Sequence, residues 1–309
     1  MFDPRTILDV AKRNQLVLLE LNAFGSASGL REVHPVEMAL ADFARNWLVP
    51  PGYLRLHQSS GDSTMKPRRP GTNINESVRQ TWLKTTLAGI PSGSRILDVG
   101  AGELKNRLHC GHLDYVSQDF CEYQGAAGGT LAEGLQTQHW DTSRIDIVSD
   151  ITAIPELGGS YDAILCSEVL EHVPEPTHAL DEFARLLKPG GRLILTAPFA
   201  SNVHMAPYHF CSGFSRYWYE HHLALRGFEI LELTPNGDWY ALLRQEITRI
   251  GGLERSRGNW AWPLAYGYAL LGLLYFKLRS PKSAADLACF GWQCLAIRVP
   301  SQAAKSEHP

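Results

Sequence analysis

The sequence predicts an α/β protein built on a doubly wound, mostly parallel sheet. Short apolar runs that are typical of buried strands alternate with stretches of helical spacing over about 100 residues. Glycine or polar residues end several of these runs, and proline ends another: Gly100, Asp119, Asp150, Ser167 and Pro198. Ligands of such sheets bind outside the carboxyl ends of the strands, so we expect the functional site at this edge.

Residues 1–75 are expected to form a helical N-terminal extension. Apolar residues recur at roughly helical spacing over residues 7–21 and 36–48, and a loop-like segment rich in Ser, Gly and Pro follows. Two interpretations stay open: an extension that packs on the main domain, or a lid over a substrate pocket. The first residues are not followed by a secretory apolar core, so no signal peptide is expected.

The first strand is expected over residues 95–99, after a helix over residues 75–90. It runs directly into Gly100 and Gly102. Because glycine has no Cβ, the backbone can turn sharply there and a ligand can approach closely. Free backbone N–H groups at such a turn suit a nucleotide-like ligand.

The second and third strands, over residues 115–118 and 145–149, each end at an aspartate. Asp119 can accept both ribose hydroxyls of a bound nucleoside; the alternative is an ordinary helix cap. Asp150 can accept a hydrogen bond from an adenine amino group, with the N–H of Ile151 meeting a ring nitrogen. The alternative for Asp150 is a turn aspartate.

The next elements continue the alternation of strand and helix. A fourth strand is expected over residues 161–166, a helix over residues 177–188, a fifth strand over residues 192–197 and a sixth over residues 227–233. A glycine-rich connection over residues 120–143 is longer than expected at its place in such a fold.

Imidazole and aromatic side chains are dense after the fifth strand: His204, Tyr208, His209, Phe210, Tyr217, Trp218, Tyr219, His221 and His222. They suit a sugar or an aromatic acceptor. The alternative is a packed helix over residues 215–225 with solvated histidines. If the reaction needs a general base, His209 is the first candidate and His204 the second. No Cys/His spacing typical of a metal site is present, so the sequence predicts no metal ligand.

A hydrophobic insertion over about residues 241–288 interrupts the main domain, which we place at residues 76–300. Residues 260–276 carry no charge, but proline and glycines within them argue against a spanning helix of about 20 apolar residues. Two interpretations stay open. The segment is a hydrophobic hairpin that covers the sheet or forms a homodimer contact, or it is an interfacial element that meets a membrane or a lipid-linked acceptor. Residues 301–309 are expected to form a flexible tail.

The net charge and the cysteines limit which kinds of partner and which cellular compartment we expect. The net charge is −3 and no long basic run is present, so we expect no nucleic-acid partner. Six cysteines occur without a Cys-x-x-Cys pair. They indicate reduced thiols in a cytoplasmic protein.

Taken together and in this order, five segments resemble the class I S-adenosylmethionine-dependent methyltransferases, nearest to the group that often acts on small molecules or glycans. The segments are residues 97–102, Asp119, Asp150, residues 166–173 and residues 187–191. The resemblance covers about residues 76–240 and a last strand near residues 294–299. It implies a Rossmann-like, seven-stranded, mostly parallel sheet with helices on both faces and the last strand antiparallel.

The same resemblance implies S-adenosyl-L-methionine as cofactor and methyl transfer to a small-molecule or glycan acceptor, at oxygen. It assigns the methionine part of the cofactor to Asp98, Gly100, Ala101 and Gly102. It assigns the adenosine part to Asp119, Phe120, Asp150 and Ile151, and the surroundings of the sulfonium to Ser167 and Glu168. His172 is expected to be structural. Arg107 is a candidate partner of the cofactor carboxylate.

Two other functions stay open from the residues alone. A nicotinamide-dependent oxidoreductase shares the glycine turn and the acid after the second strand, but its fingerprint expects a third glycine where Lys105 stands. A binding protein that keeps the fold without turnover is the second alternative. Four residues argue against a loss of cofactor binding, but they do not show whether catalysis is retained: Gly100, Gly102, Asp119 and Asp150.

Overall fold

The computed structural model describes residues 74–125, 139–279 and 284–300. The chain divides into two units, Met1–Thr72 and Asn73–Pro309, and all the described residues belong to the second. The expected N-terminal extension, apart from its last two residues, and the expected tail lie outside the described residues.

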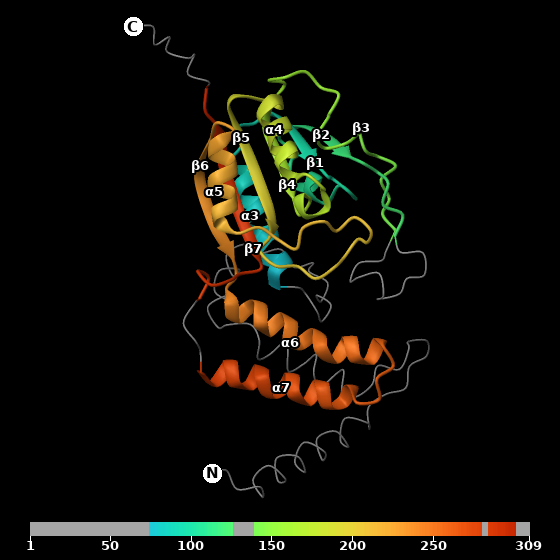
Figure 1. Ribbon diagram of the computed structural model, residues 1–309. Coiled ribbons are helices and arrows are strands. Elements are labelled where there is room, and N and C mark those ends of the chain that lie inside the picture. Colours follow the sequence, from blue (N-terminus) through green and yellow to red (C-terminus); the bar gives the residue numbers. More distant parts are fainter. Residues whose placement is uncertain (1–73, 126–138, 280–283, 301–309) are drawn as a thin grey trace, which may run out of the picture. The chain divides into compact units, whose positions relative to one another are not determined.

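The described residues form a seven-stranded sheet in the order β3-β2-β1-β4-β5-β7-β6 (Figure 1). The strands are β1 (Arg95–Val99), β2 (Asp114–Asp119), β3 (Ile147–Val148), β4 (Tyr161–Ser167), β5 (Leu187–Pro198), β6 (Phe228–Asn236) and β7 (Gly291–Arg298). Strands β1 to β5 pair in parallel, and β7 runs antiparallel to both β5 and β6. The predicted α/β class with an antiparallel last strand is therefore confirmed.

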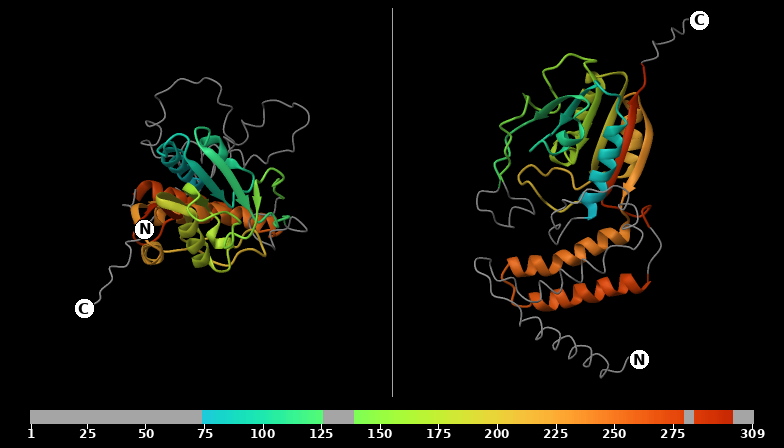
Figure 2. Two further views of the ribbon diagram at one scale, coloured as in Figure 1. Left: turned by 90° about the horizontal axis from the view of Figure 1, so that it is seen from above. Right: turned by 180° about the vertical axis from the view of Figure 1, so that it is seen from behind.

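Helices cover both faces of the sheet (Figures 1 and 2). On one face, the core contains residues of α4 (Pro176–Leu186) and α5 (Arg216–Leu225) together with Leu97 and Val99 of β1. On the other face, α3 (Ile74–Ala88) buries two leucines against Ile96. Successive side chains of a strand point to opposite faces, so one short apolar strand serves both layers.

Most boundaries differ from the sequence expectation by a few residues, and two of the differences have a clear structural reason. The helix expected to end at residue 188 ends at Leu186, because Leu187 already pairs with Tyr161 of β4 and opens β5. The third strand is only two residues long. Before this strand, a side chain takes the place of backbone pairing with β2. The carboxylate of Asp146 accepts hydrogen bonds from the backbone N–H and the hydroxyl of Ser117, at 2.9 and 2.7 Å.

The hydrophobic insertion is a pair of helices, α6 (Trp239–Ser256) and α7 (Trp262–Arg279), that lie side by side (Figure 2). Gly251 allows their close approach, because a Cβ on it would lie 2.7 Å from the ring of Tyr266. Leu242 of α6 packs with Phe290 just before β7, so the hairpin contacts the sheet at strand ends. In the described part of the chain, no helix is long and apolar enough to cross a membrane.

Candidate cofactor and acceptor site

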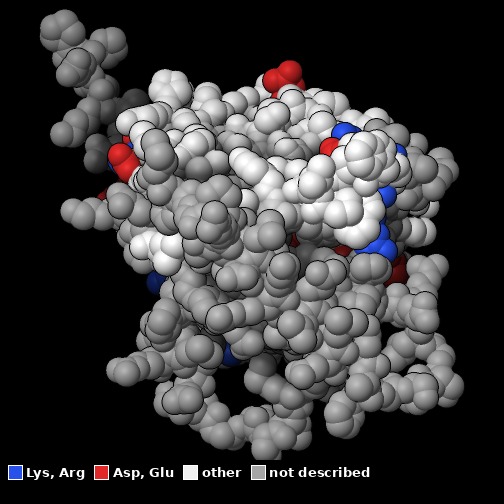
Figure 3. All heavy atoms as spheres, turned by 90° about the horizontal axis from the view of Figure 1, so that it is seen from below, with Lys and Arg blue, Asp and Glu red and all other residues white. Residues whose placement is uncertain are grey.

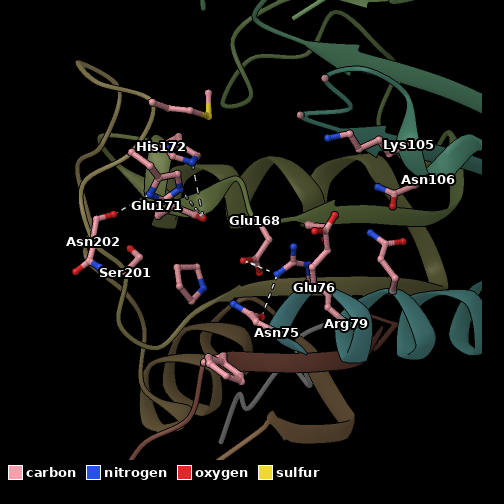
Figure 4. Close-up of a pocket in the computed structure, with 18 of the residues that line it drawn as sticks. Asn75, Glu76, Arg79, Lys105, Asn106, Glu168, Glu171, His172, Ser201 and Asn202 are labelled. Atoms are coloured by element: carbon pink, nitrogen blue, oxygen red, sulfur yellow. Dashed lines mark hydrogen bonds and ion pairs between the residues drawn. The ribbon is translucent and has the colours of Figure 1, made fainter. Parts of the chain in front are cut away.

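A cavity of about 440 Å³ lies at the carboxyl ends of β1, β4 and β5 (Figure 4). Its size falls in the range of small-molecule sites, about 300–1,000 Å³. Residues 100–102, which we call the glycine loop, line one end, and Glu171, His172 and His204 line the other. The site therefore lies at the sheet edge that the sequence predicts.

The glycine loop is held in a shape that only glycine adopts without strain. Gly100 has φ +66°, and a Cβ on it would lie 2.4 Å from a methyl carbon of Val169. The N–H of Ala101 donates to the carbonyl oxygen of Gln118, and that of Gly102 donates to Oδ2 of Asp119, both at 2.9 Å. Strand β2 thus fixes the loop from outside, and its cavity side is left to a ligand.

Asp98 lies beneath this loop and is 1 % exposed. The hydroxyl of Tyr115 donates to its Oδ2 at 2.7 Å. Burial raises the pKa of Asp98 to about 7, although the hydrogen bonds from Tyr115 and Asn106 act in the opposite direction. Asp98 therefore holds a proton below neutral pH, and it does not line the cavity, so its role toward the cofactor stays a prediction.

None of the four expected adenosine-binding residues lines the cavity: Asp119, Phe120, Asp150 and Ile151. Both carboxylate oxygens of Asp119 accept backbone N–H groups, from Gly102 and Cys121. Asp150 accepts the N–H and hydroxyl of Thr152, the pattern of a turn aspartate. Their roles toward an adenosine stay predictions.

Ser167 and Glu168, the residues expected beside the sulfonium, do line the cavity. Ser167 shares a hydrogen bond with the hydroxyl of Thr196, which also donates to Glu168 Oε1 at 3.1 Å. Glu168 has φ +58°, an uncommon conformation for a residue with a side chain. Such strain is typical of functional turns, where it sets the direction of a side chain.

Helix α3 supplies cavity residues that sequence reasoning missed. Arg79 forms an ion pair with Glu168 at 2.9 Å and donates to Oδ1 of Asn75 at 3.3 Å (Figure 4). Asn236, at the end of β6, donates to the same Asn75 oxygen at 2.6 Å. An arginine on the helix before the first strand was the available signal, but nothing in the sequence says which face of that helix meets the site.

Three histidines meet at the other end of the cavity, and we call His172, His204 and His209 the imidazole cluster. The ring centroids of His172 and His204 are 4.6 Å apart, and those of His204 and His209 are 4.9 Å apart. Of the two expected bases, His204 lines the cavity and His209 does not, although its ring contacts that of His204. His172, expected to be structural, lines the cavity as well.

The loop after β5 is tied to the turn after β4 through Glu171. Its backbone carbonyl accepts the N–H groups of Phe210 and Cys211, at 2.9 and 3.1 Å. Burial, followed by the nearby Glu168, raises the pKa of the Glu171 carboxyl well above its usual range. Burial also lowers the pKa of His172 to about 4, so this imidazole is neutral at pH 7.

His221 and His222 lie outside the site. They belong to α5, which buries Tyr219 and Leu223 in the core of the sheet. Neither histidine lines the cavity among the described residues. The packed-helix alternative for residues 215–225 therefore describes this segment.

The insertion also reaches the cavity, which the sequence did not indicate. Gln245 and Arg249 of α6 line it. Asn202, in the loop after β5, donates to Oε2 of Glu246 at 3.1 Å. Arg249 donates to the other oxygen of the same carboxylate, at 2.6 Å. The acceptor end of the cavity thus has one wall from the hairpin.

Two cations follow the glycine loop. Lys105 lines the cavity and its side chain is 66 % exposed, with its amine 3.5 Å from Glu103. Arg107, the expected partner of the cofactor carboxylate, instead lies over the ring of Tyr115, 5.7 Å from its centre. The structure thus brings Lys105 to the site and places Arg107 beside it.

Comparison with known proteins agrees with this geometry. The family described as "Methyltransferase domain" matches residues 74–245, which is more than half of the chain. A ubiquinone biosynthesis O-methyltransferase of Xanthomonas axonopodis is 35% identical over 134 residues, 42% of this chain and 52% of that protein. Its counterpart in Xanthomonas oryzae is 38% identical over 138 residues, 42% of this chain and 52% of that protein. The chain thus spans about half the length of the curated relatives it matches.

A solved structure, that of the cyclase SpnF, is similar at 21% identity over 78% of this chain and 85% of that chain, with a TM-score of 0.45. The family match takes in β1 to β6, and therefore both ends of the cavity. It decides against the nicotinamide-dependent oxidoreductase. The chain therefore belongs to the S-adenosylmethionine-dependent methyltransferases of class I.

Proposed function

We propose that the protein methylates a hydroxyl oxygen of a small-molecule acceptor. The observation that carries this proposal is the cavity that joins the glycine loop to the imidazole cluster, because it offers a cofactor end and an acceptor end in one space. The names of the relatives, O-methyltransferases of ubiquinone biosynthesis, support transfer to oxygen.

The main task of the protein's residues is to position the cofactor and the acceptor. When bound, S-adenosylmethionine brings a methyl group that is already activated. The glycine loop, with Lys105 beside it, would hold the methionine part, and Ser167 and Glu168 would border the sulfonium. Alignment of an acceptor oxygen with the methyl group and exclusion of water then account for most of the rate.

An acceptor hydroxyl must lose its proton, and the groups that can assist lie in the imidazole cluster. His204 faces the cavity, and its Nδ1 lies 2.9 Å from the carbonyl oxygen of Asn202. A carbonyl only accepts, so Nδ1 carries the hydrogen and Nε2 is free to accept one. His209 has no such orienting bond among the described residues, which favours His204 as the base.

The exposed face of α7 supports an acceptor with a large apolar part and a peripheral membrane contact. Five side chains spaced three or four residues apart form what we call the α7 stripe: Leu264, Tyr268, Leu271, Tyr275 and Leu278. Each is at least 58% exposed, and Trp260 just before the helix is 85% exposed. Figure 3 shows a view in which the described surface carries few charges. An apolar helix face with aromatic residues suits the boundary of a lipid layer.

The compartment we propose is the cytoplasm. All six cysteines are described and unpaired. Unpaired thiols are usual where the cell keeps them reduced.

Calorimetric titration with S-adenosylhomocysteine, followed by an acceptor screen with product mass spectrometry, tests the reaction. We expect binding of the cofactor product and methylation of phenols that carry apolar chains. Sugars form the second arm, because a glycan acceptor would be methylated there instead. Cofactor binding with no turnover in either arm would indicate the catalytically silent alternative, and absence of binding would overturn the proposal.

Sedimentation with anionic phospholipid vesicles tests the membrane contact. We expect Leu271→Glu to lower the bound fraction several-fold. The control Leu157→Glu changes a leucine that is 83% exposed outside the α7 stripe, and it should bind as the wild type does. If Leu271→Glu instead splits a dimer in analytical ultracentrifugation, a second copy of the chain covers the stripe, and the membrane proposal is wrong.

A further inference from the structure

The imidazole cluster brings three potential metal ligands together from two distant segments. His172 follows β4, whereas His204 and His209 lie in the loop after β5. One ring nitrogen from each lies within 4.8 Å of the other two. No cysteine or histidine spacing in the sequence predicts this arrangement, because it depends on the loop that Glu171 ties down.

Two of the imidazoles are already oriented as metal ligands usually are. Nδ1 of His172 lies 2.6 Å from the carbonyl oxygen of Tyr208, and Nδ1 of His204 is bonded to that of Asn202. Since both partners only accept, both hydrogens sit on Nδ1 and both Nε2 atoms have free lone pairs. Metal-binding histidines are commonly fixed in this way, by a hydrogen bond from the other ring nitrogen.

Polar atoms in the cluster lack partners. Both ring nitrogens of His209 and Oε2 of Glu171 are shielded from solvent and have no hydrogen-bond partner among the described residues. Glu171 is 1 % exposed, and its Oε1 lies 3.8 Å from Nε2 of His172 and 3.9 Å from Nε2 of His204. A buried polar group without a partner destabilises the folded chain, and a bound cation would remove that cost.

We propose that His172, His204 and His209 bind a divalent transition-metal ion, with Glu171 as the neighbouring oxygen ligand and zinc as the expected ion. Imidazole suits zinc, cobalt, nickel and iron, whereas magnesium and calcium prefer oxygen ligands. Ligand atoms around a tetrahedral zinc are about 3.4 Å apart, so small side-chain rotations bring the cluster to bonding distance.

The position of the site gives the ion a role that rests on the proposed function. Glu171, His172 and His204 line the acceptor end, so an open coordination position would face the acceptor hydroxyl. A hydroxyl bound to such an ion releases its proton to solvent water near neutral pH and stays bound as an oxygen nucleophile. The ion then takes over the task for which His204 would otherwise serve as a base.

The test is zinc titration of the full chain after removal of metals with a chelator, followed by cobalt titration with visible absorption spectra. We expect one ion per chain and a cobalt spectrum typical of a low-coordinate nitrogen and oxygen site. His209→Asn should weaken zinc binding at least about tenfold, and His172→Asn should do the same. The control is His222→Asn, which changes a histidine of α5 outside the cluster and should bind zinc as the wild type does.

Binding of S-adenosylhomocysteine is measured on every variant, so that loss of folding is separated from loss of the ion. Failure to bind zinc, or unchanged zinc affinity in His209→Asn, overturns the metal site. If cofactor binding and methyl transfer persist in that case, the proposed function stands and His204 returns as the base. Zinc binding without cofactor binding would support the metal site and overturn the proposed function.

Discussion

The two ends of the cavity are built in different ways. At the cofactor end, the glycine loop and Asp98 belong to one strand and the turn that follows it. At the acceptor end, side chains come from the turn after β4, the loop after β5, and α6, and Arg79 of α3 reaches Glu168 between the two ends. The first end depends on backbone shape, whereas the second depends on the packing of distant elements. Changes to the backbone of the glycine loop should therefore lower folding stability and cofactor affinity together, whereas changes to side chains outside the loop should affect the two separately.

The largest expected effect comes from Gly100→Ala. A left-handed backbone costs an alanine about 1–2 kcal/mol, and the overlap with Val169 should add about 1–3 kcal/mol. The control is Gly93→Ala. Gly93 has φ +79° and no atom lies within 4 Å of the position of its added Cβ, so this variant should lose only the stability that the left-handed backbone costs. Urea unfolding measures both, and calorimetry should show lost S-adenosylhomocysteine binding only for Gly100→Ala. Equal stabilities of the two variants would mean that Val169 does not constrain the loop.

The next effect is the pH dependence that buried Asp98 introduces. Its pKa is raised to about 7, so between about pH 4 and 7 the folded chain holds a proton that the unfolded chain has lost. Stability should therefore fall as pH rises through this window, by up to about 1.4 kcal/mol per pH unit from this group. Asp98→Asn stays neutral and should flatten the slope measured by urea unfolding.

A second variant checks the same assignment from the opposite side. Tyr115→Phe removes a hydrogen bond that favours the ionised form of Asp98, so it should extend the upper limit of the window to higher pH. A slope that is the same in wild type, Asp98→Asn and Tyr115→Phe would assign the pH dependence to other groups, of which buried Glu171 has a pKa shifted in the same direction.

Beside Glu168, between the two ends, Arg79→Gln should cost about 1–3 kcal/mol of stability, because it leaves Glu168 without its cation close to buried Glu171. The control Arg216→Gln breaks an exposed pair with Glu220 and should cost at most about 1 kcal/mol. Because Arg79 pairs with Glu168 and lies outside the glycine loop, Arg79→Gln should impair turnover more than S-adenosylhomocysteine affinity. A loss of cofactor affinity as large as that of Gly100→Ala would contradict this division.

The difference between a site built from local backbone and one built from distant elements also explains which features could be predicted from the sequence. The succession of strands and helices and the glycine turn follow from local patterns, because apolar runs and glycines act over a few residues. His204 was expected from its place after the fifth strand. Arg79 and Arg249 could not be expected, because each reaches the cavity through the packing of a helix outside the motif region. The short β3 has a similar cause, a long-range contact between side chains of Asp146 and Ser117.

The smallest expected effect decides which cation serves the cofactor end. Lys105 lines the cavity on an exposed side chain, so Lys105→Ala should leave stability within about 0.5 kcal/mol of the wild type. A charge-assisted contact with the cofactor carboxylate would make S-adenosylhomocysteine bind about three- to tenfold more weakly without it. Arg107→Ala is the matched change, since that guanidinium lies over Tyr115 outside the cavity. Weaker binding in Arg107→Ala alone would restore the sequence-based assignment, and it would mean that the loop after Gly102 rearranges when the cofactor enters.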